Sequence, residues 1–516
     1  MLAPDRSRPR RASPLGAAAP PDPPESAVYS SVTTGSSRSP VHVVAVFSDP
    51  AGLPRGLDLP DADKQALKDA LDTPGFKADA GETCPAGAKH LLLGLGKKDG
   101  LDAARLRTAA ARLLKACHRR GDSAVRLHLD AIPARSMDPA VVGRTIGEAL
   151  GLARWRIDFF DGSATKREKA SGKLTVVAGD ADLKAAIDEG LTVAEAVNEA
   201  RRLGATPPNV CNPPWFASEA RKLARRHGLK TTVITYQKAQ ELGLEGIVNV
   251  GRGSDAKPNM VILEHKPRKA RRGVRLCLVG KTMTYDSGGY SLKIQGSMRG
   301  MKYDGCGGYA VLGAMLAIAA LDLPVHVIGL MPCAENMIDG DAYRPDDIIE
   351  MYNGVTVEVT NTDAEGRMIL ADGLAYACEQ YEPTAIVDVA TLTGGVVVAL
   401  GSTYAGLWST DDELAAHVDA AGGETGEKVW RMPLHEDYRD QMRAKHADIW
   451  NSSPKRDAHP IQGAAFLSFF VPEDVPWAHV DIAGTAESEG DAVHVPGPSG
   501  FGVRLLTELA ARYARS

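Results

Sequence analysis

The segment Asn361–Arg367, with the sequence NTDAEGR, places two carboxylates and a guanidinium in one short turn. It stands between a strand-like run, VTVEVT, and a helical run, MILADGLAYACEQY. Acids two residues apart just beyond a strand end, here Asp363 and Glu365, can converge on one point in space. The simpler interpretation is a helix N-terminus, where negative charge stabilises the helix dipole. The segment alone leaves both interpretations open, so the choice depends on the chain upstream.

A second group of charged residues follows the buried strand that VRLCLVG predicts. After this strand come Lys281, Asp286 and Lys293, and the segment 287–289 (Ser-Gly-Gly) lets the backbone turn tightly between them. In an α/β protein the carboxyl ends of the strands form the rim where ligands bind. We therefore expect these side chains to lie close to Asp363 and Glu365.

Two simpler interpretations apply to parts of this region. The run Gly280–Thr282 resembles part of a phosphate-binding loop, but the pattern GxxxxGK requires glycine at the position of Arg275. Asp304 precedes a Gly-rich entry to an apolar helix, where a lone aspartate is usually an N-cap. The first interpretation fails on spacing, and the second stays open until Asp304 is placed relative to the other acids.

Three aspartates, one glutamate and two lysines at one sheet edge predict a metal site. Like charges in a partly dry site raise each other's free energy, and divalent cations would remove this repulsion. The cluster contains no His or Cys, so its ligands are oxygens and one lysine nitrogen, a hard set that suits Mn²⁺ or Mg²⁺ and tolerates Zn²⁺. A lysine ligand must be the neutral amine, so its pKa of about 10.4 must fall, which adjacent dications can enforce. The residues predict a two-metal hydrolase acting on a carbonyl or a phosphoryl group.

The elements that position these residues alternate between strands and helices, which predicts an α/β fold. We expect a disordered tail rich in Pro, Ser, Ala and Arg at 1–40, an N-terminal α/β domain with a linker helix at 41–199, and a larger C-terminal domain at 200–516. The strands of the C-terminal domain are apolar and β-branched, which indicates burial on both faces by crossover helices. We therefore predict a mixed, mainly parallel sheet flanked by helices for this domain.

Composition excludes several classes of protein. The 516 residues are 44% hydrophobic and 24% charged, as in soluble globular proteins, and the net charge of -5 provides no basic surface for nucleic acid. No apolar run reaches membrane-spanning length, and the N-terminus has no apolar signal core. Seven scattered cysteines without a CxxC pair predict reduced thiols. These observations predict a soluble, cytoplasmic protein without a membrane or nucleic-acid partner.

Several motifs resemble the leucyl aminopeptidase (cytosol aminopeptidase) family over roughly residues 200 to 516. They are, in chain order, VGKTMTYDSGGYSLK, MKYDGCGG, NTDAEGRMILADGLAYA, DVATLTG, WAHVDIAGTA and GFGVRLL. The combination of GK, DSGG and NTDAEGR at this spacing is highly specific. The N-terminal α/β domain resembles the family's non-catalytic domain more weakly.

The resemblance implies two divalent metal ions per subunit, manganese or zinc. One metal would be held by Lys281, Asp286, Asp304 and Glu365, and the other by Asp286, Asp363 and Glu365, so that Asp286 and Glu365 bridge them. Lys293 would polarise the scissile carbonyl and stabilise the oxyanion. Arg367 would hold a bicarbonate that takes the proton of the attacking water.

The resemblance also implies a substrate and an assembly. The first side chain of the substrate, preferably Leu or another apolar residue, would lie among Met301, Thr391, Leu392 and Gly394. Family members are homohexamers whose active sites face an interior cavity, which restricts the substrates to short peptides. The expected reaction is release of the N-terminal amino acid.

This chain departs from the family pattern at a few positions. Gly305, Tyr309 and Thr282 stand where the family usually has Met, Ala, and Gly or Ala, and a small-residue run of the family is altered near 461–463. None is a predicted ligand, so we expect catalysis to survive. Gly305 and Tyr309 adjoin Asp304. Whether they change the pocket or weaken the binding of one metal stays open at this point.

Two other functions stay open at this point. Some members of the family bind DNA for regulation, although the acidic net charge of this chain argues against that role. The ligand set alone also allows another two-metal reaction, phosphoryl transfer.

Overall fold

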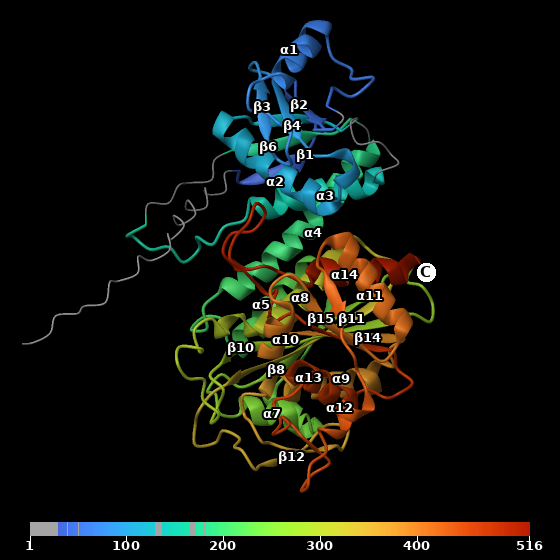
Figure 1. The fold of residues 1–516 in the computed structure, drawn as a ribbon. Helices are drawn as coiled ribbons and strands as arrows, with labels where there is room; N and C mark the ends of the chain where they lie inside the picture. The colour runs from blue at the N-terminus through green and yellow to red at the C-terminus, as the bar shows by residue number, and fades with distance from the viewer. Residues whose placement is uncertain are drawn as a thin grey trace, which may run out of the picture.

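The computed structural model describes residues 29–38, 40–49, 51–129, 137–165, 172–179 and 181–515. The chain forms two α/β domains, and the long helix α4 (Ala181–Ala205) runs from the smaller to the larger (Figure 1). This architecture confirms the predicted fold class.

The N-terminal domain is built on a six-stranded sheet in the order β1-β6-β5-β2-β4-β3. Strand β3 runs antiparallel to β4, and the other neighbouring pairs are parallel. The elements of this domain that precede α4 are β1 (Ser31–Thr34), β2 (Val41–Val46), α1 (Asp61–Leu71), β3 (Thr83–Ala86), β4 (His90–Gly94), η1 (Lys98–Gly100), α2 (Ala103–Arg120), β5 (Ala124–His128), α3 (Pro139–Ala153) and β6 (Lys173–Val177).

The predicted tail at 1–40 is wrong for its last part. Residues 1–28 lie outside the described residues, but Ser31–Thr34 form the edge strand β1, which pairs in parallel with β6. Tyr29 and Val32 are buried. A four-residue strand with one buried side chain has too little periodicity to be recognised, because its hydrogen bonds come from a neighbour some 140 residues later in the chain.

The C-terminal domain contains a nine-stranded sheet in the order β16-β15-β18-β14-β9-β11-β8-β7, with β10 paired to β11. Its strands are β7 (Lys230–Ile234), β8 (Asn259–His265), β9 (Arg275–Gly280), β10 (Thr282–Asp286), β11 (His326–Asn336), β14 (Ala385–Ala390), β15 (Ala405–Ser409), β16 (Val429–Arg431) and β18 (Trp477–Asp481). Five neighbouring pairs are parallel, including β9 with both β11 and β14, and three are antiparallel.

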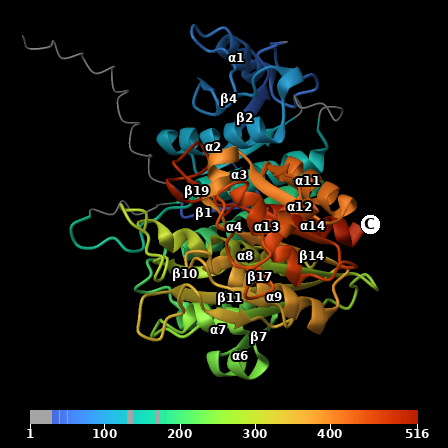
Figure 2. The same cartoon turned by 60° about the horizontal axis from the view of Figure 1, so that its bottom comes forward.

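Helices cover both faces of this sheet. They are α5 (Pro213–Arg226), α6 (Tyr236–Leu242), α7 (Glu245–Gly251), η2 (Met301–Gly305), α8 (Cys306–Ala320), α9 (Glu365–Tyr381), α10 (Gly394–Leu400), α11 (Asp412–Thr425), α12 (Glu436–Asp440), α13 (His459–Leu467), η3 (Ser468–Phe470) and α14 (Val503–Arg515). In Figure 1, α5, α8, α11 and α14 lie on the side of the smaller domain, and α7, α9 and α13 lie on the opposite side. Figure 2 shows α1 and α6 at opposite ends of the molecule.

The central strand β9 is apolar at successive positions because both of its faces are buried. Leu276 and Leu278 belong to the hydrophobic core on one face of the sheet, and Cys277 and Val279 belong to the core on the other face. Successive side chains of a strand point to opposite faces, so a strand covered on both sides must be apolar at every position. The burial of β9 fixes the point at which the chain emerges with Lys281.

The run VTVEVT forms β13 (Thr356–Glu358), which does not join the large sheet. It pairs with β12 (Ile348–Glu350) and β17 (Ile449–Trp450) in a small separate sheet, and β19 (Glu487–Ser488) pairs with β20 (Gly497–Pro498) in another. The expectation that a strand of the large sheet delivers Asp363 and Glu365 is therefore wrong. These acids reach the sheet edge through the start of α9.

Among the residues that the structure describes, one helical segment is long and apolar enough to span a membrane. This segment, Met301–Ala320, comprises η2 and α8, and 78% of its most apolar part is buried inside the protein. Helix α8 packs in the core next to β9. Its apolar composition is accounted for by this buried position.

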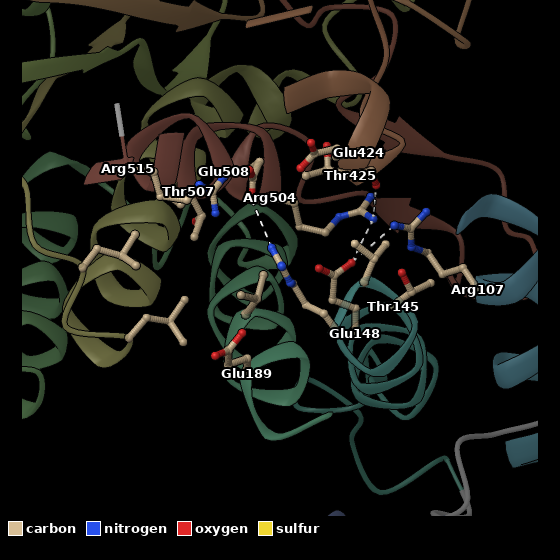
Figure 3. Close-up of a pocket in the computed structure, with 16 residues that line it drawn as sticks. Arg107, Thr145, Glu148, Glu189, Glu424, Thr425, Arg504, Thr507, Glu508 and Arg515 are labelled. Atoms are coloured by element: carbon tan, nitrogen blue, oxygen red, sulfur yellow. Dashed lines mark hydrogen bonds and ion pairs between the residues drawn. The ribbon is translucent and has the colours of Figure 1, made fainter. Parts of the chain in front are cut away.

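Charged side chains join the two domains. A cavity of about 220 Å³ lies between α2 to α4 of the first domain and α11 and α14 of the second (Figure 3). Within it, Glu148 Oε2 pairs with Arg107 Nη2 at 3.4 Å and with Arg504 Nη1 at 3.6 Å, and Arg144 Nη1 pairs with Glu508 Oε2 at 3.1 Å. The side chains of Arg107, Glu148 and Arg504 are each less than a tenth exposed.

We predict that Glu148→Ala destabilises this domain junction. Removing one partner of a buried ion pair leaves the opposite charge uncompensated, which costs about 3 kcal/mol, at the lower end of the usual range because Arg504 keeps its pair with Glu427. Chemical or thermal unfolding measures the change. Glu189→Ala is the matched control, because Glu189 lines the same cavity but is exposed. Equal stability of the two variants would contradict the role of the ion pairs.

Candidate metal centre

The structure brings all the predicted site residues to one cavity of about 630 Å³ at the edge of the large sheet. Lys281 stands between β9 and β10, Asp286 ends β10, Asp304 lies in η2, and Glu365 begins α9. The remaining predicted residues that line the cavity are Lys293, Met301, Asp363, Arg367, Thr391, Leu392 and Gly394.

Lys281 organises one half of the acid cluster. Its Nζ lies 2.8 Å from Asp304 Oδ1 and 3.0 Å from Glu365 Oε1, and it donates a hydrogen bond to the carbonyl oxygen of Thr391 at 2.8 Å. The Thr391 hydroxyl donates to Asp304 Oδ1 at 2.8 Å. Three elements far apart in the chain thus converge on one ammonium group, and Asp304 is part of the cluster.

Lys293 organises the other half. Its Nζ lies 2.8 Å from Asp286 Oδ2 and 2.5 Å from Asp363 Oδ1. The other oxygen of Asp286 accepts hydrogen bonds from the backbone N–H of Gly288 and from Asn336 Nδ2, both at 2.8 Å. The Asp286 carboxylate is therefore fixed from two sides.

Two glycines are required for this close approach. Gly288 has φ +85°, and a Cβ on it would lie 2.9 Å from Asp363 Oδ1 and 2.6 Å from the Ser291 carbonyl oxygen. A Cβ on Gly366 would lie 2.4 Å from Lys281 Cε. One glycine of each motif, Gly288 in DSGG and Gly366 in NTDAEGR, therefore makes room for the charged groups.

The carboxylate oxygens fit a divalent cation. One ligand oxygen from each of Asp286, Asp363 and Glu365 lies within 4.8 Å of the others. Asp304 Oδ2 and Glu365 Oε2 are buried and accept no hydrogen bond from the part of the chain that the structure describes. Buried charged acceptors without partners are costly, and a cation would satisfy them. The two lysine ammonium groups also do not neutralise the four carboxylates, so the cluster carries excess negative charge.

The pKa values of the acids reflect their burial and their mutual repulsion in one site. Burial and the nearby carboxylates raise the pKa of Asp304 to about 8 and that of Asp286 to about 6. The lysines act in the opposite direction but do not cancel this effect. Burial alone would also raise the pKa of Glu365, but Lys281 and Lys293 lower it. The cluster therefore retains a proton at neutral pH, and a bound dication would displace it.

The two lysines are held as ammonium ions. Burial alone would lower the pKa of each, but Asp304, Glu365 and Asp286 raise that of Lys281, and Asp286, Glu365 and Asp363 raise that of Lys293. Each ammonium thus supplies positive charge next to the carboxylates. A metal at Lys281 would have to displace this proton before the amine nitrogen could bind it.

Arg367 is buried behind the acid cluster. Its Nη1 donates to the carbonyl oxygen of Asn451 at 2.8 Å, and its Nε has no acceptor among the residues described. Burial lowers the pKa of Arg367 to about 10, against the opposing effects of Glu365 and Asp481. The guanidinium stays charged at neutral pH and can attract an anion in the cavity.

Two residues that hold the site were not predicted. Asn336, the last residue of β11, donates to Asp286, and its place at the end of an apolar strand on the same sheet edge was a usable signal. Asp481 accepts hydrogen bonds from the Leu392 N–H at 3.0 Å and the Thr393 hydroxyl at 2.7 Å. It fixes the loop that carries Thr391, and only the spatial arrangement reveals this contact.

Gly305 and Tyr309 form a matched pair. A Cβ on Gly305 would lie 2.6 Å from Tyr309 Cζ, so the ring fills the space of a side chain at position 305. The Tyr309 hydroxyl lies 3.3 Å from Cys211 Sγ, and its ring packs on Phe216 in the core. This exchange of large and small residues leaves the contacts of Asp304 intact.

Comparisons with known proteins identify the family of this chain. Residues 198–507 match the model of the cytosol aminopeptidase family, catalytic domain, and residues 43–164 match that of the N-terminal domain of the same family. The chain belongs to the cytosol aminopeptidase family, a family of metal-dependent exopeptidases, and its acid cluster is compatible with the binding of a divalent metal. This confirms the resemblance found in the motifs.

Individual relatives span almost the whole chain. A probable cytosol aminopeptidase of Methylobacillus flagellatus is 39% identical over 480 residues, which are 91% of this chain and 94% of that protein. One of Synechococcus sp. is 40% identical over 481 residues, or 88% and 94% of the two chains. The solved structure of the bottromycin maturation enzyme BotP has a TM-score of 0.78 at 34% identity and covers 93% of this chain and all of that one. A second structure of BotP is a complex with Mn.

We predict that Gly305→Met is tolerated only together with Tyr309→Ala. Methionine alone would overpack the Tyr309 ring at a cost of about 1–3 kcal/mol, whereas the double variant restores the residue pair usual in the family. A double-mutant cycle on unfolding free energies should give a favourable coupling of about 1–3 kcal/mol. Gly340→Met is the control, because a side chain there meets nothing within 4 Å. Additive effects of the two substitutions would contradict the pairing.

Proposed function

We propose that this protein is a leucyl aminopeptidase-type enzyme that releases the N-terminal residue of short peptides with two divalent metal ions, manganese or zinc. The observation that carries the proposal is the convergence of four carboxylates and two lysines in one cavity beside an apolar pocket. Family membership and the manganese complex of BotP support the metal dependence.

The division of the cluster into two ion-paired halves supports two metals. Lys281, Asp304 and Glu365 would hold one ion, and Asp363 the other, with Asp286 and Glu365 reaching both. Bound ions supply Lewis acidity, which lowers the pKa of water and polarises a carbonyl group. Asn336 and Gly288 would keep Asp286 oriented toward both positions.

The cavity walls would orient the substrate. Lys293 carries an ammonium group at the acid cluster, where it would stabilise the negative charge that develops on the scissile carbonyl oxygen. Arg367 would attract a bicarbonate or another anion beside the reaction site. The free α-amine of the substrate, being cationic in solution, would be drawn to the excess of carboxylates, which places the cut after the first residue.

The pocket favours an apolar first residue. Met301, Leu392 and the loop that Asp481 fixes line the cavity. Burying each methylene there contributes about 0.8 kcal/mol, so Leu and Met are expected to be preferred over small residues. Asp and Glu are expected to be poor first residues, because they would add charge to an acidic site.

Exposed apolar residues support an oligomer. Leu292, Ile294 and Val397 line the mouth of the cavity and are 45%, 65% and 43% exposed. We propose a cytoplasmic homohexamer in which neighbouring subunits cover this rim and restrict access to short peptides.

A substrate panel tests the proposed function. We expect hydrolysis of Leu-amide, loss of activity after dialysis against a chelator, and recovery on addition of Mn²⁺ or Zn²⁺. N-acetyl-Leu-amide should be refractory, because acetylation removes the charge and lone pair of the amine. Equal rates on the two amides would contradict an exopeptidase. Activity on a nucleotide substrate and none on amides would instead support a phosphoryl-transfer enzyme.

Lys293→Ala separates a catalytic lysine from a neutralising one. A group that stabilises only the transition state lowers kcat far more than it raises KM, and we expect a fall of about 100- to 1000-fold. Metal analysis and kinetics with Leu-amide measure both effects. Lys302→Ala is the control, because Lys302 donates to the Ala205 carbonyl outside the acid cluster. Activity of Lys293→Ala within a few-fold of the parent would refute the catalytic role.

A further inference from the structure

A fifth acidic side chain, which was not predicted for the site, lines the cavity of the acid cluster. Glu487 is the first residue of β19, and its side chain is exposed. The four acids of the cluster each pair with Lys281 or Lys293. For Glu487, by contrast, the described part of the chain provides no ion pair or side-chain hydrogen bond, not even from Arg299, which lines the same cavity. The Glu487 carboxylate can therefore pair with a cationic group of a substrate.

Contacts of β19 and β20 place Glu487 beside η2. Glu487 lies opposite Pro498 in the antiparallel pair that these two strands form. Gly497, the neighbour of Pro498, packs against η2, because a Cβ on this glycine would lie 3.9 Å from the Tyr303 hydroxyl oxygen. A Cβ on Gly204, near the end of α4, would lie 2.9 Å from Pro498 Cβ. The two strands therefore pack on both α4 and η2, and these contacts hold Glu487 next to the element that carries Met301 and Asp304.

The charge of Glu487 acts on two groups of this wall. Burial raises the pKa of Tyr303 in η2 and that of Cys306 at the start of α8, and Glu487 is among the charges that add to this effect. Lys302 acts in the opposite direction on Cys306. Its ammonium group donates to the Ala205 carbonyl oxygen at 3.2 Å instead of pairing with Glu487. The carboxylate therefore adds negative charge to the cavity wall that η2 and α8 form.

Apolar side chains line the same cavity as Glu487. Ala486, which directly precedes Glu487, is buried, and Met301, Leu392 and Ala483 are further lining residues. Lysine and arginine bury their methylene groups along apolar surface while the charged end stays at a polar group or in water. A cavity that combines apolar walls with an unpaired carboxylate suits such a side chain as well as that of leucine.

We propose that Glu487 is a specificity-determining residue that binds the cationic end of a long basic first side chain. The enzyme would then accept peptides that begin with Lys or Arg as well as those that begin with an apolar residue. The inference rests on the proposed function and adds a substrate class to it. The methylene groups of the first residue would lie on Met301 and Ala486, and its ammonium or guanidinium group would pair with the Glu487 carboxylate. The α-amine would bind at the acid cluster, as it would in other substrates.

A comparison of Lys-amide with norleucine-amide tests the proposal in the full-length, metal-loaded protein. Norleucine has the four-carbon side chain of lysine without the ammonium group, so the ratio of the two kcat/KM values reports on the charge alone. Glu487→Gln should lower this Lys/norleucine ratio by about two- to fivefold, which is the effect of losing an exposed ion pair. Glu487→Lys should lower it by about tenfold, because repulsion replaces attraction. Salt at 1 M should reduce both effects, since the screening length falls to about 3 Å.

Glu489→Lys is the matched control. It changes the net charge as Glu487→Lys does, and Glu489 is exposed two residues further along the chain but is not among the described residues that line the cavity. The control should keep the parent's ratio. A ratio in Glu487→Lys within about twofold of the parent's, which is too small for a lost pair, would overturn the proposal. So would an equal fall in Glu489→Lys, or a parent that hydrolyses norleucine-amide but not Lys-amide. A parent that hydrolyses neither these amides nor Leu-amide with metal present would instead overturn the proposed function.

Discussion

Mutual repulsion of four carboxylates in one largely buried cavity is the constraint on which the site depends. Asp286, Asp304 and Glu365 are each less than a tenth exposed, and two ammonium groups cannot neutralise them together with Asp363. Removing such groups from water is unfavourable unless opposite charge compensates them. The folded chain therefore favours the binding of divalent cations. Burial and the neighbouring carboxylates raise the pKa of Asp304 to about 8 for the same electrostatic reason, although Lys281 acts in the opposite direction.

The rest of the domain supplies the framework that keeps these charges together. Strand β9 is apolar on both faces, and its burial fixes the position of Lys281, which directly follows the strand at the sheet edge. Glycines at 288 and 366 let carboxylate and ammonium approach closely, and Asp481 ties down the loop whose Thr391 contacts both Lys281 and Asp304. Packing energy from the two cores thus offsets the cost of the charged site.

The convergence of the acids and lysines in one cavity could be predicted from the sequence, because these residues lie in short motifs at the ends of strands and the starts of helices. Lys281 and Asp286 follow a strand that is recognisable from its apolar run, so their position was predictable. Contacts between distant segments were not: β13 leaves the large sheet, β1 depends on a partner late in the domain, and Asp481 acts on a loop 89 residues away. The pairing of Gly305 with Tyr309 also required the structure, since single departures from a family pattern do not reveal compensation.

The most direct test of the central claim is anomalous diffraction from crystals of the manganese-loaded protein. We expect two anomalous peaks per chain within bonding distance of the carboxylates, one beside Lys281, Asp304 and Glu365 and the other beside Asp363, with Asp286 reaching both. Metal binding at these positions would also separate each lysine from at least one of its present carboxylate partners. An active preparation whose crystals show no anomalous peak at these carboxylates would contradict the account.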